Sequence, residues 1–169
     1  MLDDDIVAAA KRLLDICRRK QLTIATAESC TGGLVAGTLT EIPGVSSMLD
    51  RGFITYSNQA KQDMLGVPAA ILKAHGAVSR ETAEAMVKGA LANAPVDLAV
   101  SVTGIAGPES DGTEKPVGLV HFAAASRSGQ FSHCEKRYGN PGRSEIRNLS
   151  VLQAFVMLHE LAESEPARR

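Results

Sequence analysis

The spacing of apolar residues along the chain alternates between a helical and an extended pattern. Apolar positions three and four residues apart predict amphipathic helices, whereas short apolar runs rich in β-branched residues predict buried strands. Helices are predicted over residues 3–20, 31–40, 59–65, 68–73, 81–92 and 143–163. Strands are predicted over residues 23–27, 51–56, 98–103, 117–125 and 130–138. This alternating order, with one late hairpin, predicts an α/β fold: a three-layer α/β/α sandwich around a mixed sheet.

Composition narrows the class of protein. The 169 residues have the length of one domain, and we expect residues 1–169 to form a single unit. A formal net charge of −1, 4% aromatic residues and no tryptophan give no support for nucleic-acid binding. The three cysteines lack CxxC spacing, which argues against a disulfide framework or a structural zinc site. We expect a cytoplasmic protein that binds no membrane, because no signal peptide or long apolar run is present.

The segment 28–33 (ESCTGG), directly after a predicted strand, carries the first candidate chemistry. A strand that runs through hydroxyl and thiol side chains and two glycines into a helix is typical of an active-site turn. Free N–H groups at such a turn can hold an anion or a developing oxyanion. Ser29 and Cys30 are both candidate nucleophiles. A helix cap is the alternative role for Ser29 or Thr31, and packing is the favoured role for Cys30.

Lys61 is the candidate general base. It lies on the first turn of a predicted helix, where the helix dipole disfavours a cation and lowers the pKa of a lysine. A serine nucleophile needs an adjacent base, and Ser–Lys pairs supply one. The alternative for Lys61 is a solvated surface charge. The histidines are scattered without HxH or HExxH spacing, so we expect no metal site.

A third loop and two arginines complete the candidate site. Residues 103–108 (TGIAGP) leave backbone N–H groups free for a phosphate or carboxamide oxygen, but match neither a P-loop nor a dinucleotide fingerprint. Arg143 and Arg147 share one helix face and can bind a phosphate together, with a surface pair or a subunit contact as the alternative. Because ligands bind at the carboxyl ends of strands in such sheets, we expect these loops to converge.

Three motifs stand in the order and spacing of a known family. They are residues 27–33 (AESCTGG), residues 52–58 (GFITYSN) followed by Lys61, and residues 102–108 (VTGIAGP). With them the chain resembles the competence/damage-inducible protein A C-terminal domain family. Its enzymatic members are nicotinamide-nucleotide amidohydrolases, also called nicotinamide mononucleotide deamidases. The resemblance runs from the first predicted helix to the last.

The resemblance implies one amidohydrolase-like domain that converts nicotinamide mononucleotide to nicotinate mononucleotide and ammonia, without a metal or organic cofactor. It implies a nucleophile at Ser29 and a base at Lys61, with Tyr56 and Thr103 also in the catalytic site. Together with the loop chemistry it gives these substrate-binding positions: Thr31, Gly32, Gly33, Asn58, Gly104, Gly107, Arg143 and Arg147. Before Arg143 the sequence YGNPG departs from the commoner Gly-Asp lead-in of the family.

A non-catalytic module that binds nucleotide phosphate is the competing hypothesis. It would use the same glycine loops and arginines, but it would need neither Ser29 nor Lys61. We therefore expect an enzyme, and the resemblance implies a role in pyridine-nucleotide recycling with a small nucleotide substrate as its partner. Apolar faces on several predicted helices favour a homo-oligomer.

Overall fold

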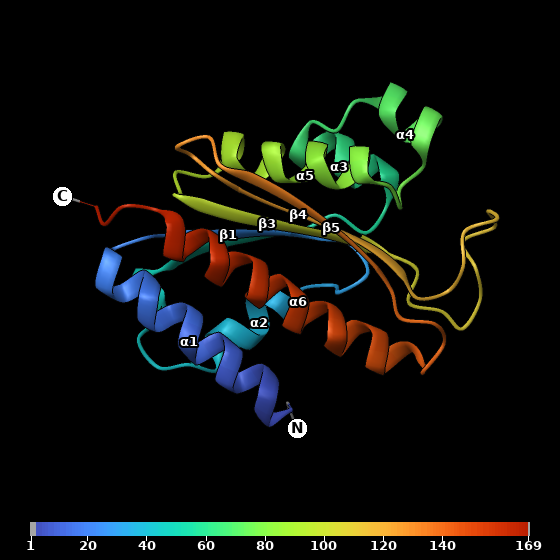
Figure 1. Ribbon diagram of the computed structural model, residues 1–169. Coiled ribbons are helices and arrows are strands. Elements are labelled where there is room, and N and C mark those ends of the chain that lie inside the picture. The colour runs from blue at the N-terminus through green and yellow to red at the C-terminus, as the bar shows by residue number, and fades with distance from the viewer. Residues whose placement is uncertain (1–2, 169) are drawn as a thin grey trace.

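A computed structural model describes residues 3–168; Met1, Leu2 and Arg169 lie outside the described residues. A five-stranded mixed sheet carries helices on both faces (Figure 1), so the predicted α/β/α sandwich is confirmed. In chain order the elements are α1 (Asp4–Lys20), β1 (Ile24–Glu28), α2 (Leu34–Thr40), the 3₁₀ turn η1 (Val45–Ser47), β2 (Leu49–Ile54), α3 (Asn58–Leu65), α4 (Ala69–His75), α5 (Arg80–Asn93), β3 (Leu98–Gly104), β4 (Leu119–Ser126), β5 (Phe131–Arg137) and α6 (Arg143–Ser164).

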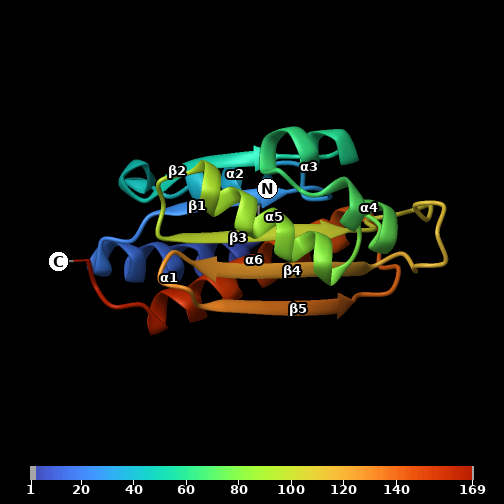
Figure 2. The same ribbon diagram turned by 90° about the horizontal axis from the view of Figure 1, so that it is seen from above.

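The strand order creates a ligand position beside β1. The strands lie in the order β2-β1-β3-β4-β5 (Figure 2). Strand β1 is parallel to both β2 and β3, whereas β4 is antiparallel to both of its neighbours, β3 and β5. Helices α1, α2 and α6 cover one face of the sheet, and α3, α4 and α5 cover the other. The chain therefore leaves β1 toward one face and β2 toward the opposite face. In open α/β sheets, ligands bind at the carboxyl ends of strands next to such a reversal.

The two faces of the sheet pack differently. On one face Val100, Val102 and Phe122 belong to the large apolar core beneath α1 and α6. On the other face Ala99 and Ala123 pack against α5. Their small side chains let α5 lie close to the strands. The central strands β1, β3 and β4 are buried almost throughout, which explains their apolar sequences.

The main difference from the prediction is the start of α2. The helix begins at Leu34 rather than Thr31. Gly32 and Gly33 have φ values of +57° and +99°, which a helix does not accommodate. Residues 29–33, which lie between β1 and α2 and begin with Ser29, therefore form a non-helical turn.

Candidate active site

Ser29 and Lys61 form a buried pair. Ser29 lies directly beyond β1, and its backbone N–H donates to the carbonyl of Val102 on β3 at 2.9 Å. Lys61 reaches back from α3, which lies on the opposite face of the sheet from α2, and its Nζ lies 3.0 Å from Ser29 Oγ. Ser29 is 8% exposed and Lys61 is 1% exposed. The pairing predicted from the sequence is thus present as a hydrogen bond between a hydroxyl and an amine.

Neutral oxygens surround the amine of Lys61. Besides Ser29 Oγ, its Nζ donates to the carbonyl of Thr55 at 2.8 Å and lies 3.4 Å from that of Tyr56. Burial lowers the pKa of Lys61 to about 8, while the nearby Cys30 acts in the opposite direction. Removal from water is therefore the largest cause of the lowered pKa of Lys61. At pH 7 about a tenth of such amines are neutral and able to accept a proton.

Glu28, which sequence analysis did not assign a role, caps α2. One carboxylate oxygen accepts from the N–H of Val35 at 2.8 Å, and the other accepts from the N–H of Ala36 and the hydroxyl of Thr26, both at 3.1 Å. These bonds satisfy N–H groups of the first helical turn. The predicted alternative, a capping role for Ser29 or Thr31, is wrong because Glu28 fills it. A glutamate at the end of a buried strand was the available signal.

The turn after Ser29 keeps some backbone donors free. The N–H of Gly32 donates to the carbonyl of Ser29 at 3.0 Å, so this N–H is committed to the turn. Across residues 3–168, the N–H groups of Thr31 and Gly33 have no acceptor in the protein. The hydroxyl of Thr31 is buried and also lacks a partner within the described chain. These groups are the donors that an oxyanion next to Ser29 would find.

Arg143 joins the other two loops. From the start of α6 its guanidinium donates to the carbonyl of Gly107 at 2.7 Å and to the hydroxyl of Tyr56 at 2.9 Å. Tyr56 follows β2 and is 60% exposed, and Arg143 is exposed as well, so we call this exposed pair the rim. The loops that follow β2 and β3 therefore meet at Arg143, as their expected convergence requires. Both side chains remain accessible to a ligand.

The two arginines are not engaged in the same way. Arg147, one helical turn beyond Arg143, donates from Nε to the carbonyl of Cys30 at 3.1 Å and from Nη2 to that of Thr31 at 3.2 Å. Its guanidinium is thus bound to the turn after Ser29 rather than to Tyr56 and Gly107. The structure does not present the pair as one joint phosphate clamp, because only Arg143 faces the open rim.

Other predicted site residues have structural partners. The hydroxyl of Thr103 is buried and donates to the carbonyl of Ala77 at 2.7 Å, which ties β3 to the segment before α5. Asn58 is the exposed first residue of α3. A Cβ at Gly104 would lie 2.7 Å from a methyl of Val120, so packing alone requires glycine there. Among the described residues, the hydroxyl of Thr103 is thus bonded to Ala77 and not to Ser29 or Lys61.

Cys30 is a poor candidate nucleophile. The thiol is buried, and burial raises its pKa to about 12, so almost no thiolate forms near neutral pH. We expect Cys30→Ala to keep activity within about threefold of the original chain, because a buried thiol acts mainly as packing. Native protein treated with iodoacetamide should stay active and unmodified at Cys30 by mass spectrometry. Inactivation that parallels alkylation of Cys30 would restore the thiol as a candidate.

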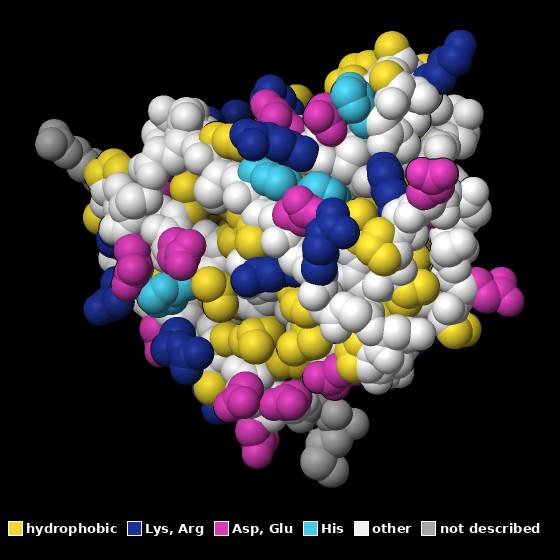
Figure 3. All heavy atoms as spheres, turned by 45° about the vertical axis from the view of Figure 1, so that its right-hand side comes forward, with side chains coloured by type: hydrophobic (Ala, Val, Ile, Leu, Met, Phe, Trp, Pro, Cys, Tyr) yellow, Lys and Arg dark blue, Asp and Glu magenta, His cyan; other side chains and the backbone are white. Residues whose placement is uncertain are grey.

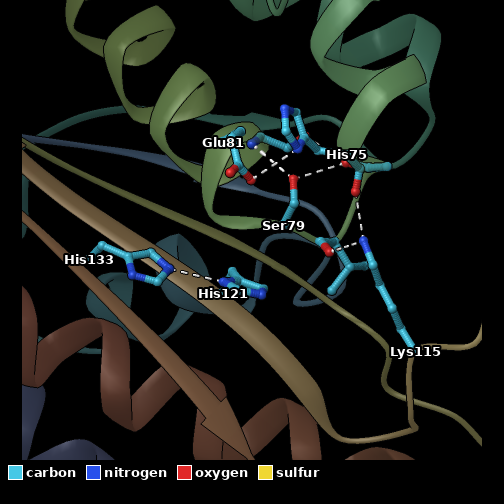
Figure 4. A network of polar contacts seen from close by, with 9 residues as sticks. His75, Ser79, Glu81, Lys115, His121 and His133 are labelled. Carbon is cyan, nitrogen blue, oxygen red and sulfur yellow. Dashed lines mark hydrogen bonds and ion pairs between the residues drawn. The ribbon is translucent and has the colours of Figure 1, made fainter.

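A second polar cluster lies on the α5 side of the sheet (Figure 4). The rings of His121 and His133 approach to 2.9 Å between Nδ1 and Nε2, and Lys115 donates to the carbonyls of His75 and Val78 at 2.6 Å. A pocket of about 810 Å³ adjoins the cluster, and neither Ser29 nor Lys61 lines it. Its charged lining residues are Arg80, Lys115, Arg137, Glu81, Glu114 and Glu135. Opposite charges therefore balance there, and Figure 3 shows acidic and basic side chains interspersed around histidines on the face that it draws.

Comparison with known proteins identifies the family. The model of the CinA C-terminal domain matches residues 7–162. The chain belongs to this family. This chain is 48% identical over 164 residues to a CinA-like protein of Geobacter sulfurreducens, and the match covers 93% of the chain and 39% of that protein. It is also 48% identical over 157 residues to a CinA-like protein of Synechococcus sp. (strain RCC307), covering 92% of the chain and 37% of that protein. The chain thus spans well under half the length of these relatives.

Solved structures share the fold of this CinA domain. A competence/damage-inducible protein from Agrobacterium tumefaciens superposes with a TM-score of 0.93 at 52% identity, over 95% of this chain and 98% of that one. A CinA superfamily protein from Klebsiella pneumoniae 700603 gives a TM-score of 0.90 at 31% identity, over 95% and 99%. Among residues 3–168 of the CinA domain, none of the helices has the length and apolarity to cross a bilayer. Within the same range, no three His, Cys, Asp or Glu side chains cluster as metal ligands.

Proposed function

We propose that this CinA domain is an amidohydrolase that converts nicotinamide mononucleotide to nicotinate mononucleotide and ammonia. The observation that carries the proposal is the 3.0 Å contact between Ser29 Oγ and Lys61 Nζ, in a buried setting where the pKa of Lys61 is lowered to about 8. A module that only binds phosphate needs neither a buried amine nor a hydroxyl placed against it. The choice of nicotinamide mononucleotide rests on the family resemblance of the three motifs.

In the first half of the reaction the carboxamide is cleaved. Neutral Lys61 accepts the hydroxyl proton of Ser29 as Oγ attacks the carboxamide carbon and forms a C–O bond. The carbonyl oxygen becomes an oxyanion, for which the free N–H groups of Thr31 and Gly33 are candidate donors. Protonated Lys61 then gives its proton to the amide nitrogen as the C–N bond breaks. Ammonia leaves, and nicotinate mononucleotide remains as an ester on Ser29.

Water completes the reaction. Lys61 accepts a proton from the water that attacks the ester carbon, and the second tetrahedral adduct collapses with return of the proton to Ser29 Oγ. The carbonyl of Thr55, bonded to Nζ at 2.8 Å, keeps the amine aimed at Ser29 in both halves. Arg143, accessible at the rim and bonded only to neutral oxygens, is the side chain best placed for the phosphate of the nucleotide.

The decisive experiment measures products from three related amides. The purified chain is incubated separately with nicotinamide mononucleotide, nicotinamide riboside and nicotinamide, and both ammonia and the carboxylate product are quantified. We expect the mononucleotide to be preferred by about 10- to 100-fold in kcat/KM over the riboside, because only the former offers a phosphate to Arg143. Binding of the mononucleotide without any product would instead support the phosphate-binding module.

A further inference from the structure

Arg147 contacts two successive carbonyl groups of the turn after Ser29. Its Nε lies 3.1 Å from the oxygen of Cys30, and its Nη2 lies 3.2 Å from the oxygen of Thr31. The side chain is partly buried, and the two contacts come from the side of the sheet that carries α6. A Cβ on Gly32 would lie 3.6 Å from Nη2, which shows how closely the guanidinium covers the turn. The planar fork of an arginine fits this pair of acceptors, and a lysine has no equivalent geometry.

These carbonyls determine where the neighbouring N–H groups point. In a trans peptide the C=O and N–H bonds are antiparallel. The carbonyl of Cys30 shares its peptide with the N–H of Thr31, so a bond that holds the carbonyl toward α6 directs that N–H the opposite way. The N–H of Thr31 has no acceptor among residues 3–168. Arg147 therefore fixes the orientation of the free N–H of Thr31, two residues after Ser29.

We propose that Arg147 is a positioning residue that orients and polarises the peptide between Cys30 and Thr31 as an oxyanion donor, and that it is not a phosphate ligand. This inference rests on the proposed Ser29 chemistry. The cationic guanidinium acts in two ways. It holds the peptide plane, and its hydrogen bond to the carbonyl strengthens the N–H at the other end as a donor. Both effects stabilise the transition state and leave ground-state binding of the nucleotide nearly unchanged.

Arg143 provides a matched comparison one helical turn away. Its donors go to Tyr56 Oη and the carbonyl of Gly107 at the open rim, and neither group belongs to the turn after Ser29. Loss of Arg143 should therefore weaken substrate binding, whereas loss of Arg147 should slow the chemical step. Substitution of Arg143 is thus expected to change mainly KM, and substitution of Arg147 mainly kcat.

The test compares Arg147→Ala, Arg147→Lys and Arg143→Ala with the original chain in ammonia release from nicotinamide mononucleotide. We expect Arg147→Ala to lower kcat about 100-fold with KM changed less than about threefold. The kcat of Arg147→Lys should lie between those of the original chain and Arg147→Ala. Arg143→Ala should raise KM about 10-fold or more with a smaller change in kcat. In the original chain kcat/KM should rise toward pH 8 as the Lys61 amine becomes neutral, and this rise should persist in Arg147→Lys because Lys61 is untouched. A raised KM with normal kcat in Arg147→Ala and Arg147→Lys would overturn the inference.

Addition of methylguanidinium separates positioning from a general loss of folding. Thermal unfolding is recorded for every variant. Methylguanidinium should restore part of the kcat of Arg147→Ala, since it can occupy the vacated space against the carbonyls of Cys30 and Thr31. It should leave the kcat of Arg143→Ala unchanged. Equal responses of the two variants would contradict the specific role of Arg147.

A fluorophosphonate probe makes the result independent of the substrate proposal. Ser29 Oγ attacks the phosphorus, fluoride leaves, and the serine proton passes to Lys61, so the probe reports on the nucleophile and on donors to the phosphonyl oxygen. We expect Arg147→Ala to slow labelling of Ser29 at least 10-fold relative to the original chain, whereas Lys73→Met, which removes an exposed lysine of α4, should label at the original rate. If the original chain labels but releases no ammonia, the nucleotide assignment fails while the role of Arg147 is still measured. Equal labelling rates in the original chain and Arg147→Ala would overturn that role.

Discussion

Replacing Ser29 by alanine is expected to lower turnover of nicotinamide mononucleotide by about 10⁴-fold or more. The substitution removes the oxygen that forms the covalent ester, and Lys61 Nζ loses its 3.0 Å partner. Packing should change little, because Ser29 is held by its backbone N–H bond to Val102, which alanine retains. Ammonia release measured under saturating substrate gives the rate, and circular dichroism during heating gives the melting temperature.

Ser132→Ala is the control for this substitution. Ser132 is exposed on β5, the edge strand at the opposite end of the sheet from β2. It should have the activity of the original chain. If Ser29→Ala kept more than about a tenth of the normal rate, Ser29 would not be the nucleophile, because no other step in the mechanism could tolerate its loss.

Replacing Lys61 by methionine is expected to abolish activity near neutral pH and to change how stability depends on pH. Activity falls because methionine cannot accept the serine proton, and we expect a loss of about 10³-fold or more. In the original chain kcat/KM should rise with pH and level off above about 8, where the Lys61 amine, its pKa lowered by burial, becomes neutral. The pH profile of ammonia release measures both expectations.

The stability effect has a definite sign. Burial lowers the pKa of Lys61 from 10.5 to about 8, so between these values the unfolded chain binds a proton that the folded chain does not. The free energy of unfolding therefore rises with pH across this window, by an amount on the order of 3 kcal/mol for this group. Below about pH 8 both states carry the proton, and the folded state bears the full cost of a buried cation.

Urea unfolding at several pH values between 7 and 10.5 measures this rise. The difference in unfolding free energy between the original chain and Lys61→Met should increase in favour of the original chain as the pH rises. Lys73→Met removes an exposed lysine of α4 and should give a difference that does not follow this curve. A constant difference between the original chain and Lys61→Met would mean that the amine is not desolvated in the native state.

The sequence was sufficient for the parts of the site that depend on local order along the chain. Apolar runs marked β1, β2 and β3, and the loops after parallel strands end at one edge of a sheet, so Ser29 and the Lys61 helix could be brought together in advance. The start of α2 was misplaced because helical periodicity continues through Gly32 and Gly33. Only their positive φ values reveal the turn.

Contacts set by side-chain direction could not be predicted in this way. Arg143 and Arg147 share a helix face, yet one guanidinium lies at the rim and the other bonds to the carbonyls of Cys30 and Thr31. Thr103 lies on a motif strand, but the alternation of the strand turns its hydroxyl toward Ala77. These outcomes depend on distances between elements that no local pattern encodes.

The surroundings of the Lys61 amine also affect how activity should respond to ionic strength. Dissolved ions weaken interactions between charges, but they do not return water to a side chain that is 1% exposed. The pKa of Lys61 is lowered by burial, and its hydrogen-bond partners are uncharged oxygens. The lowered pKa of Lys61, and with it the fraction of neutral amine at a given pH, should therefore be nearly the same in dilute buffer and in concentrated salt. Capture of the anionic substrate by Arg143 should weaken over the same range, so salt acts on substrate binding and spares the proton transfer.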